Sequence, residues 1–232
     1  MNFNERIASA QTIYGWFTKS DMAVIDALLK EVYNRANKPL NVLEIGTYKG
    51  RSTVFLLLSL PPNSQLTYVD IFEDCNDHGE NGIIKGKLTG GQLERICKNN
   101  ITKTQRFANR TDVQVTHVRA DSKVWLKENR NKFKKLFNFI FIDGDHRYEG
   151  VKADLLNSLP LIKDDGIIAG HDFGISGPEV TKFVIDELGE YAERIEPQVE
   201  DNSTTSVWFI DSKLNELKRK LCEDNEQHST AT

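Results

Sequence analysis

Cysteine is scarce in this chain, and long apolar runs are missing. The three cysteines, Cys75, Cys97 and Cys222, are widely spaced and form no CxxC or Cys/His pattern, which argues against a disulfide framework or a zinc site. The longest strongly apolar run, residues 54–60, is far too short to cross a bilayer. The first residues also lack the basic-then-apolar order of a secretory signal. These absences predict a cytoplasmic protein with reduced thiols and no membrane partner.

An excess of basic residues is missing as well. Lys and Arg number 30 against 34 Asp and Glu, which gives a formal net charge of -4. Because nucleic-acid binding relies on a basic field, this balance disfavours a nucleic-acid partner. The basic residues within 98–110 are better explained as a solvated face of mixed charge. The oligomeric state is left open, a homo-oligomer included.

Predicted strands and helices alternate from residue 40 to residue 189. A helix over residues 21–35, with Asp21 as its cap, precedes this alternation. Residues 73–91 are polar and glycine-rich and are expected to form a long loop. The expected strands are residues 40–46, 65–72, 113–122, 137–144 and 166–173, with two more near 193–197 and 205–211. The expected helices between them are residues 51–60, 91–103, 123–133, 149–162 and 178–190.

The strand expected at residues 137–144 is apolar at almost every position, which indicates burial on both of its faces. The pattern predicts a doubly wound α/β fold, with a mostly parallel, Rossmann-like sheet of seven strands and helices on both faces. At 232 residues the chain suits one domain. We expect a helical cap or lid (1–38), the core (39–212) and a polar tail (213–232). In such sheets, ligands bind beyond the carboxyl ends of the strands.

The first strand runs into the pattern ExGxxxG, formed by Glu44, Gly46 and Gly50. The glycines permit a tight turn and close approach of a ligand, and the helix behind them offers free N–H groups to a carboxylate. Glu44 can accept a hydrogen bond from an ammonium, so a ligand with both an amine and a carboxylate fits. Asp70 ends the second strand, where a carboxylate can bind both hydroxyls of a ribose. Residues 120–122, after the third strand, can meet a purine amino group.

The loop lacks the middle glycine of the dinucleotide pattern GxGxxG, which disfavours a pyrophosphate ligand. An NAD-linked or hydroxylase-like enzyme on the same fold stays an alternative, as does a non-catalytic nucleoside-binding module. The expected contacts of a nucleoside cofactor are Glu44, Gly46, Thr47, Tyr48, Gly50, Ser52, Asp70, Ile71, Asp121 and Ser122.

The stretches VLEIGTYKG, TYVD and ADS resemble the first motif, the ribose-binding strand end and the adenine-binding turn of class I S-adenosylmethionine-dependent methyltransferases. Residues 139–173 are similar to a bacterial branch of small-molecule methyltransferases, near the O-methyltransferases that tailor macrolides and aminocoumarins. The resemblance covers residues 40–173 and continues more weakly to the strand at 205–211. It implies S-adenosylmethionine as the cofactor. It also implies a hydroxyl of a small molecule, such as a sugar or natural-product intermediate, as the methyl acceptor.

Acidic and histidine side chains follow the fourth and fifth strands. In the strand order that the family implies, these strands are neighbours, so their ends converge. Carboxylates crowded at one rim repel each other unless a cation organises them, and oxygen-rich ligation suits Mg²⁺, with Mn²⁺ or Fe²⁺ as further choices. The resemblance to metal-dependent O-methyltransferases, the catechol type included, implies Asp143, His171 and Asp172 as the metal ligands.

His146 stands where the catechol type has a lysine base, three residues after the metal aspartate. We expect His146 to be the catalytic base, with Asp143 as the second choice. Both clusters have a structural alternative, since Asp145 and His146 can cap the next helix and His171 and Asp172 can form a hydrogen-bonded turn.

Two further segments are candidates for shaping substrate choice. Residues 14–17 form an aromatic cluster that either folds over the site as a lid or anchors in the core. The loop at residues 73–91, which contains His78, is a second candidate lid. His117 is expected to be a packing residue, and His228 to have no role.

Overall fold

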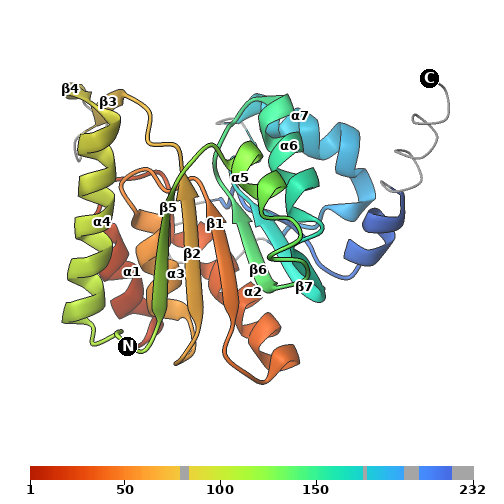
Figure 1. Cartoon of the computed structure of the whole chain (residues 1–232), viewed down its shortest axis with the longest axis horizontal. Coiled ribbons are helices and arrows are strands. Elements are labelled where there is room, and N and C mark those ends of the chain that lie inside the picture. The colour runs from red at the N-terminus through yellow and green to blue at the C-terminus, as the bar shows by residue number, and fades with distance from the viewer. Residues whose placement is uncertain (79–83, 175–176, 196–203, 221–232) are drawn as a thin grey trace.

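The computed structural model describes residues 1–78, 84–174, 177–195 and 204–220, and its centre is a six-stranded sheet. The strand order is β5-β2-β1-β6-β7-β8, and the strands from β5 to β7 can be followed across Figure 1. Strand β8 alone runs antiparallel to its neighbour. The mostly parallel sheet is confirmed. The described residues add no seventh strand to this sheet, and Glu193 forms only an isolated bridge to Phe209. The strands are β1 (Asn41–Ile45), β2 (Gln65–Asp70), β5 (Gln114–Arg119), β6 (Phe137–Ile142), β7 (Ile162–Gly170) and β8 (Trp208–Ile210).

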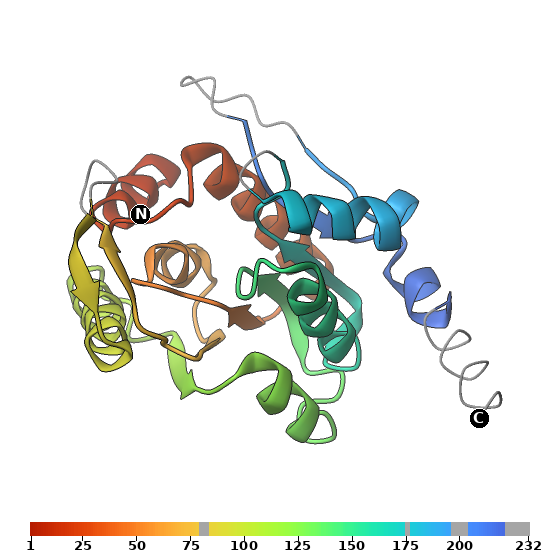
Figure 2. The ribbon, with the colours of Figure 1, turned by 90° about the horizontal axis from the view of Figure 1, so that it is seen from above.

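Helices cover both faces of the sheet, as predicted for a doubly wound fold (Figure 2). One face packs against α1 (Phe3–Gln11), α2 (Lys19–Ala36), α3 (Arg51–Ser59) and α4 (Gly90–Phe107). The other face packs against α5 (Ser122–Glu128), α6 (Tyr148–Ser158) and α7 (Pro178–Phe183). Helix α7 continues as a π-helical turn (Val184–Leu188) and a 3₁₀ turn (Gly189–Tyr191), in place of the single helix expected over 178–190.

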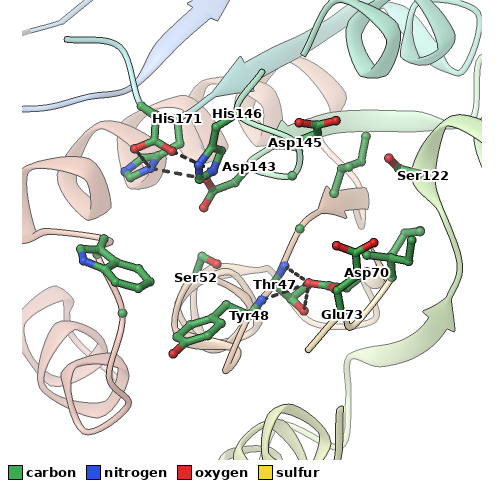
Figure 3. Close-up of a pocket in the computed structure, with 18 of the residues that line it drawn as sticks. Thr47, Tyr48, Ser52, Asp70, Glu73, Ser122, Asp143, Asp145, His146 and His171 are labelled. Carbon is green, nitrogen blue, oxygen red and sulfur yellow. Dashed lines mark hydrogen bonds and ion pairs between the residues drawn. The ribbon is translucent and has the colours of Figure 1, made fainter. Parts of the chain in front are cut away.

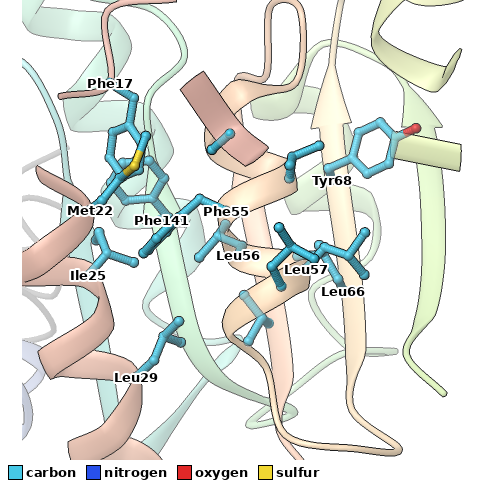
Figure 4. Close-up of a cluster of buried hydrophobic side chains, with 14 of the residues drawn as sticks. Phe17, Met22, Ile25, Leu29, Phe55, Leu56, Leu57, Leu66, Tyr68 and Phe141 are labelled. Carbon is cyan, nitrogen blue, oxygen red and sulfur yellow. The ribbon is translucent and has the colours of Figure 1, made fainter. Parts of the chain in front are cut away.

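The core has one half on each side of the sheet, because side chains along a strand alternate between its faces. In β6, Phe139 and Phe141 join the α1–α4 side, while Ile140 and Ile142 join the other. Figure 4 shows the first half, where side chains of α2 and α3 meet those of β2 and β6. Burial on both faces explains why every residue of this strand from Phe139 to Ile142 is apolar.

Several elements differ from the sequence prediction. Helix α2 begins at Lys19 with Thr18 as its N-cap, and Asp21 is the third helical residue of a capping box. Helix α1 is a separate element, with its own capping box between Asn2 and Glu5.

The long loop expected over residues 73–91 is wrong in part, because it contains an antiparallel hairpin of β3 (Cys75–His78) and β4 (Ile84–Leu88). Its strands pair with each other and β4 is mostly exposed, so they lack the apolar alternation of a half-buried strand. A 2.6 Å ion pair between Lys49 and Asp77 connects the hairpin to the loop after β1. Packing also continues past residue 212, where Leu214 and Leu217 are buried. Cys222 and His228 lie outside the described residues.

Among the described helices, none combines the length and the apolarity that a membrane crossing needs.

Candidate active site

A cavity of about 750 Å³ lies at the carboxyl ends of β1, β2, β6 and β7 (Figure 3). This is the edge at which a doubly wound sheet binds its ligands. Most of the predicted site residues line it, namely Gly46, Thr47, Tyr48, Ser52, Asp70, Ile71, Asp121, Ser122, Asp143, His146, His171 and Asp172. Glu44 and Gly50 are the two predicted residues that do not line it.

The loop after β1 passes against the end of β6 with no room for a side chain at Gly46. A Cβ atom there would lie 2.0 Å from the carbonyl oxygen of Asp143, and the φ angle of 83° is one that L-residues rarely adopt. Gly50, with φ of 87°, is the N-cap of α3, and no side chain caps this helix. The glycines therefore shape the loop and the start of α3, and Thr47, Tyr48 and Ser52 form the surface that faces the cavity.

Asp70 holds this loop in place. Its Oδ2 atom accepts hydrogen bonds from the backbone N–H of Thr47 at 2.7 Å and of Tyr48 at 3.1 Å, and its Oδ1 atom accepts one from Phe72 N–H at 2.6 Å. The carboxylate expected to meet a ribose thus also fixes the backbone beside it. Next to it, the apolar side chain of Ile71 is 45% exposed in the cavity, which suits contact with a flat apolar ligand.

The turn after β5 places Asp121 and Ser122 at the opposite end of the cavity from the β7 strand end. Asp121 caps α5 by accepting a 2.9 Å bond from the N–H of Lys123. Ser122 donates its hydroxyl proton to Asp154 Oδ1 at 2.6 Å, so its oxygen faces a ligand as an acceptor. Burial raises the pKa of Asp154 to about 6. The sequence prediction missed Asp154, because a carboxylate within a helical stretch carries no signal of such a contact.

Glu44 is fully buried and lies outside the cavity, so the structure does not bring it to the position predicted for an ammonium contact. It shares the face of β1 that α3 covers, and its carboxylate oxygens have no hydrogen-bond partner among the described residues. Burial raises the pKa of Glu44 from 4.5 to about 8, and the nearby hydroxyls of Ser52 and Thr53 oppose the shift. The folded protein therefore holds this carboxyl in its neutral form at pH 7.

Replacing Glu44 with Gln should change the pH dependence of stability. A pKa raised in the folded state means that the contribution of Glu44 is fully present below pH 4.5 and is lost as the pH rises towards 8. Glutamine stays neutral, so the melting temperature of the variant relative to wild type should rise from pH 5 to pH 9, by the equivalent of a few kcal/mol. Thermal melts across this range measure it. Glu149→Gln, at an exposed position, is the control, and an unchanging difference for Glu44→Gln would contradict the prediction.

The ends of β6 and β7 bring two carboxylates and two imidazoles together (Figure 3). Ligand atoms of Asp143, His146 and Asp172 lie within 4.8 Å of one another. His171, predicted as a ligand in place of His146, lies behind this group, with its Nδ1 atom 3.5 Å from one oxygen each of Asp143 and Asp172. All four residues thus converge, as the neighbouring strands predicted.

The charges in this cluster depend on one another. Burial lowers the pKa of His171, but the negative charge of Asp143 and hydrogen bonds to carboxylates outweigh it and raise the pKa well above its usual value. A hydrogen bond to Asp143 raises the pKa of His146, although partial burial opposes it. Burial raises the pKa of Asp143, yet the charge of His171 makes the net shift downward. In each case the net shift favours the charged form, because the carboxylates and imidazoles of the cluster stabilise one another's charges.

The side chain of Asp21 reaches the same cluster from α2 and is 0% exposed. Its Oδ2 atom lies 3.2 Å from His171 Nε2. Burial raises the pKa of Asp21, but hydrogen bonds from His171 and Thr18 and the charge of His171 lower it well below its usual range. The sequence prediction treated Asp21 only as a helix cap, because nothing in a linear sequence pairs it with a residue 150 positions away.

Two roles are expected for the aromatic segment at residues 14–17, a cover over the site and an anchor in the core, and they fall to different residues. Trp16 lines the cavity, is 57% exposed and lies 5.4 Å from the Tyr48 ring. Phe17 is buried, with its ring 5.7 Å from that of His171. Arg51 anchors the segment by donating to the carbonyl of Gly15. His117, by contrast, lies away from the cavity and packs between the rings of Tyr68 and Phe72, as predicted.

Sequence comparison assigns this fold and cavity to a known family. The profile of a family described as a methyltransferase domain matches residues 43–173, more than half of the chain. The chain belongs to this family, and its fold is that of the class I, S-adenosylmethionine-dependent methyltransferases. No curated protein sequence matches it at a significant level.

Solved structures of similar fold include three methyltransferases. CalS11, a calicheamicin methyltransferase described as a TDP-rhamnose 3'-O-methyltransferase, is 18% identical, with 90% of this chain and 91% of that chain covered and a TM-score of 0.56. An O-methyltransferase from Bacillus cereus in complex with SAH is 17% identical, with 90% and 89% covered and a TM-score of 0.54. MycE from the mycinamycin biosynthetic pathway, in complex with Mg and SAH, is 16% identical, with 91% and 54% covered and a TM-score of 0.53. At these identities the likeness is one of fold.

Proposed function

We propose that the protein transfers a methyl group from S-adenosylmethionine to a hydroxyl of a small molecule, with the help of a divalent cation. One observation carries the proposal: a single cavity joins the nucleoside-type rim at Gly46, Asp70 and Ser122 to the cluster of Asp143, His146 and Asp172. The first part suits a donor that carries adenosine and an amino acid. The second part suits activation of a hydroxyl.

The cofactor contacts follow from the groups that face the cavity. The loop of Thr47 and Tyr48 and the uncapped start of α3 suit the amino-acid end, because N–H groups at a helix start favour a carboxylate. Asp70 and Ile71 suit the ribose and one face of the adenine. The acceptor oxygen of Ser122 suits the adenine amino group, which is a donor. Bound there, S-adenosylmethionine supplies a methyl group on a sulfonium sulfur.

The donor set fits a divalent cation. Asp143 and Asp172 offer carboxylate oxygens, and His171 and His146 offer imidazole nitrogens within the same small volume. Mixed oxygen and nitrogen ligation is compatible with Mg²⁺, Mn²⁺ or Fe²⁺. Such an ion acts as a Lewis acid and lowers the pKa of a hydroxyl that it binds. We assign Asp143, His171 and Asp172 as its ligands, which leaves His146 for the proton.

His146 is the residue best arranged to remove that proton. Its side chain is 59% exposed at the cavity, and its Nε2 atom lies 3.0 Å from Asp172 Oδ2. The neighbouring carboxylates stabilise the imidazolium that forms when it accepts a proton, which favours a general base. Asp143 is the second choice, because it contacts both histidines.

The acceptor side of the cavity combines apolar and polar side chains. Trp16 presents an exposed ring to the cavity, which His146 and Arg147 also line. An aromatic ring beside hydroxyl-binding groups suits a sugar or a phenol, and the fold neighbour CalS11 acts on a sugar nucleotide. A screen of hydroxylated sugars and phenols for uptake of labelled methyl tests the acceptor class. Calorimetry with S-adenosylhomocysteine and with NAD tests the cofactor, and binding of NAD alone would refute the proposal.

Removal of divalent cations should abolish turnover. Excess EDTA is expected to stop methyl transfer, and added Mg²⁺ or Mn²⁺ to restore it. Without the ion, no Lewis acid at Asp143 and Asp172 lowers the pKa of the acceptor hydroxyl. Affinity for S-adenosylhomocysteine, measured by calorimetry, should stay close to that of the untreated enzyme. Full activity in excess chelator would remove the metal from the mechanism.

A further inference from the structure

Asp21 makes a contact that helix capping does not require. As the third residue of α2, its Oδ2 atom accepts the capping-box bond from Thr18 N–H at 2.8 Å. The same carboxylate extends beyond the helix to His171 Nε2 at 3.2 Å and to the N–H of Ser206 at 2.9 Å. A fully buried carboxylate is expensive unless it is paired, so this arrangement indicates a role in holding the groups around it.

The donors and acceptors around His171 Nε2 define which atom carries the proton. Both Asp21 oxygens are acceptors. Ser206 Oγ lies 2.9 Å from Nε2 and 3.4 Å from Asp21 Oδ1, so Ser206 can donate to Asp21 and accept from Nε2. The contact between Asp21 Oδ2 and Nε2 at 3.2 Å is favourable only when Nε2 bears hydrogen, because a bare Nε2 would turn its lone pair towards the carboxylate. The remaining nitrogen, Nδ1, faces Asp143 and Asp172 at 3.5 Å each.

We propose that Asp21 is a positioning residue of the metal centre: it fixes His171 with Nε2 protonated and Nδ1 aimed at the cation. The inference rests on the metal site of the proposed function. A metal-bound imidazole needs a partner for its second nitrogen, which sets both the ring orientation and the tautomer. Here this partner is Asp21 of α2, and the tautomer that it selects leaves the lone pair of His171 Nδ1 available to the cation.

Calorimetric titration with Mn²⁺ separates this role from capping. Asp21→Asn keeps the size of the side chain but gives it one acceptor oxygen, so it should weaken Mn²⁺ binding by about 10- to 100-fold and leave S-adenosylhomocysteine affinity unchanged. Thr18→Ala is the matched control. It removes the hydroxyl that accepts from Asp21 N–H and donates to Asp21 Oδ2 at 2.7 Å, which lowers the melting temperature. The carboxylate keeps its bonds from the N–H groups of Thr18 and Ser206 and its contact with His171, so this variant should bind Mn²⁺ close to wild type.

A double-mutant cycle tests whether Asp21 acts through His171. In a His171→Asn background, adding Asp21→Asn should cause no further loss of Mn²⁺ affinity, because the group that it positions is gone. The role of Asp21 would be overturned if the Mn²⁺ affinity losses of the two single variants multiplied in the double variant. Wild-type Mn²⁺ affinity in Asp21→Asn alone would overturn it as well. If the wild-type protein binds S-adenosylhomocysteine but not Mn²⁺, the metal assignment itself fails, and the role of Asp21 fails with it.

A measurement on the wild-type protein covers the case in which Asp21→Asn does not fold. Nitrogen-15 NMR of labelled histidine with Mg²⁺ bound distinguishes the two tautomers, and the His171 signals are those lost in His171→Asn. We expect hydrogen on Nε2 and a Mg²⁺-dependent shift of Nδ1. Hydrogen on Nδ1 in the Mg²⁺-bound protein would overturn the inference.

Discussion

Gly46→Ala is expected to bind S-adenosylhomocysteine about a hundred times more weakly than wild type. The added Cβ atom would lie 2.0 Å from the carbonyl oxygen of Asp143, and the φ angle of 83° would be strained for alanine even without that contact. Neither atom can move alone, because the Cβ atom is bonded directly to the backbone of the loop after β1 and the oxygen belongs to the backbone at the end of β6. Backbone strain of about 2–3 kcal/mol, if relieved only by shifting the loop, corresponds to an affinity loss of about 30- to 150-fold.

The matched control for this variant is Gly91→Ala. Gly91 lies in the first turn of α4, where a Cβ atom would meet nothing within 4 Å. This variant should bind S-adenosylhomocysteine as wild type does, with an unchanged or slightly higher melting temperature. Calorimetry and thermal melts of both variants make the comparison. A Gly46→Ala protein that binds the ligand within a few-fold of wild type would show that the loop is not the cofactor site.

Asp172→Asn should abolish methyl transfer while keeping the cofactor bound. We choose asparagine because Asp172 has a positive φ of 61°, which asparagine tolerates and alanine does not. The change removes one negative charge from the cluster that would hold the cation. Loss of Lewis-acid assistance is worth several kcal/mol, so turnover should fall by about 1000-fold or more. Affinity for S-adenosylhomocysteine, measured by calorimetry, should change little.

Asp145→Asn provides a control from the same loop. The carboxylate of Asp145 pairs with Arg147 and Lys123, each at 2.7 Å, and stands apart from the group of Asp143, His146 and Asp172. The two partners of Asp145 are 35% and 77% exposed, and ion pairs so open to solvent contribute little, so turnover of this variant should stay within about fivefold of wild type. Equal losses in both variants would indicate a general effect of charge in the cavity and would argue against a metal ligand at Asp172.

Much of the site could be predicted from the sequence because a parallel sheet delivers its functional groups at the strand ends. The motif around Gly46, Asp70 at the end of β2 and Asp143 at the end of β6 all meet at the cavity. Glu44 lies outside the cavity for a reason that the sequence also contains. It alternates with Leu43 and Ile45 along β1, so it lies on the opposite face, which α3 covers.

Contacts between distant segments could not be predicted in this way. Asp21 looks like an ordinary helix cap, and only the packing of α2 beside β7 brings it to His171. Asp154 is likewise a polar residue on a helix until the fold places Ser122 against it. The hairpin of β3 and β4 was missed because its strands bury little, and burial is what makes a strand visible in a sequence.

The position of Trp16 has a consequence for how such an enzyme changes its preference. The wall that it forms belongs to a short stretch before α2, whereas the groups assigned to the methyl donor belong to the ends of parallel strands. Substitutions at Trp16 would change this wall and its contact with Tyr48, and would leave the strand ends at Asp70 and Ser122 as they are. In the proposed function, the acceptor wall and most donor contacts come from different stretches of the chain, so the wall can diverge while the strand ends are kept.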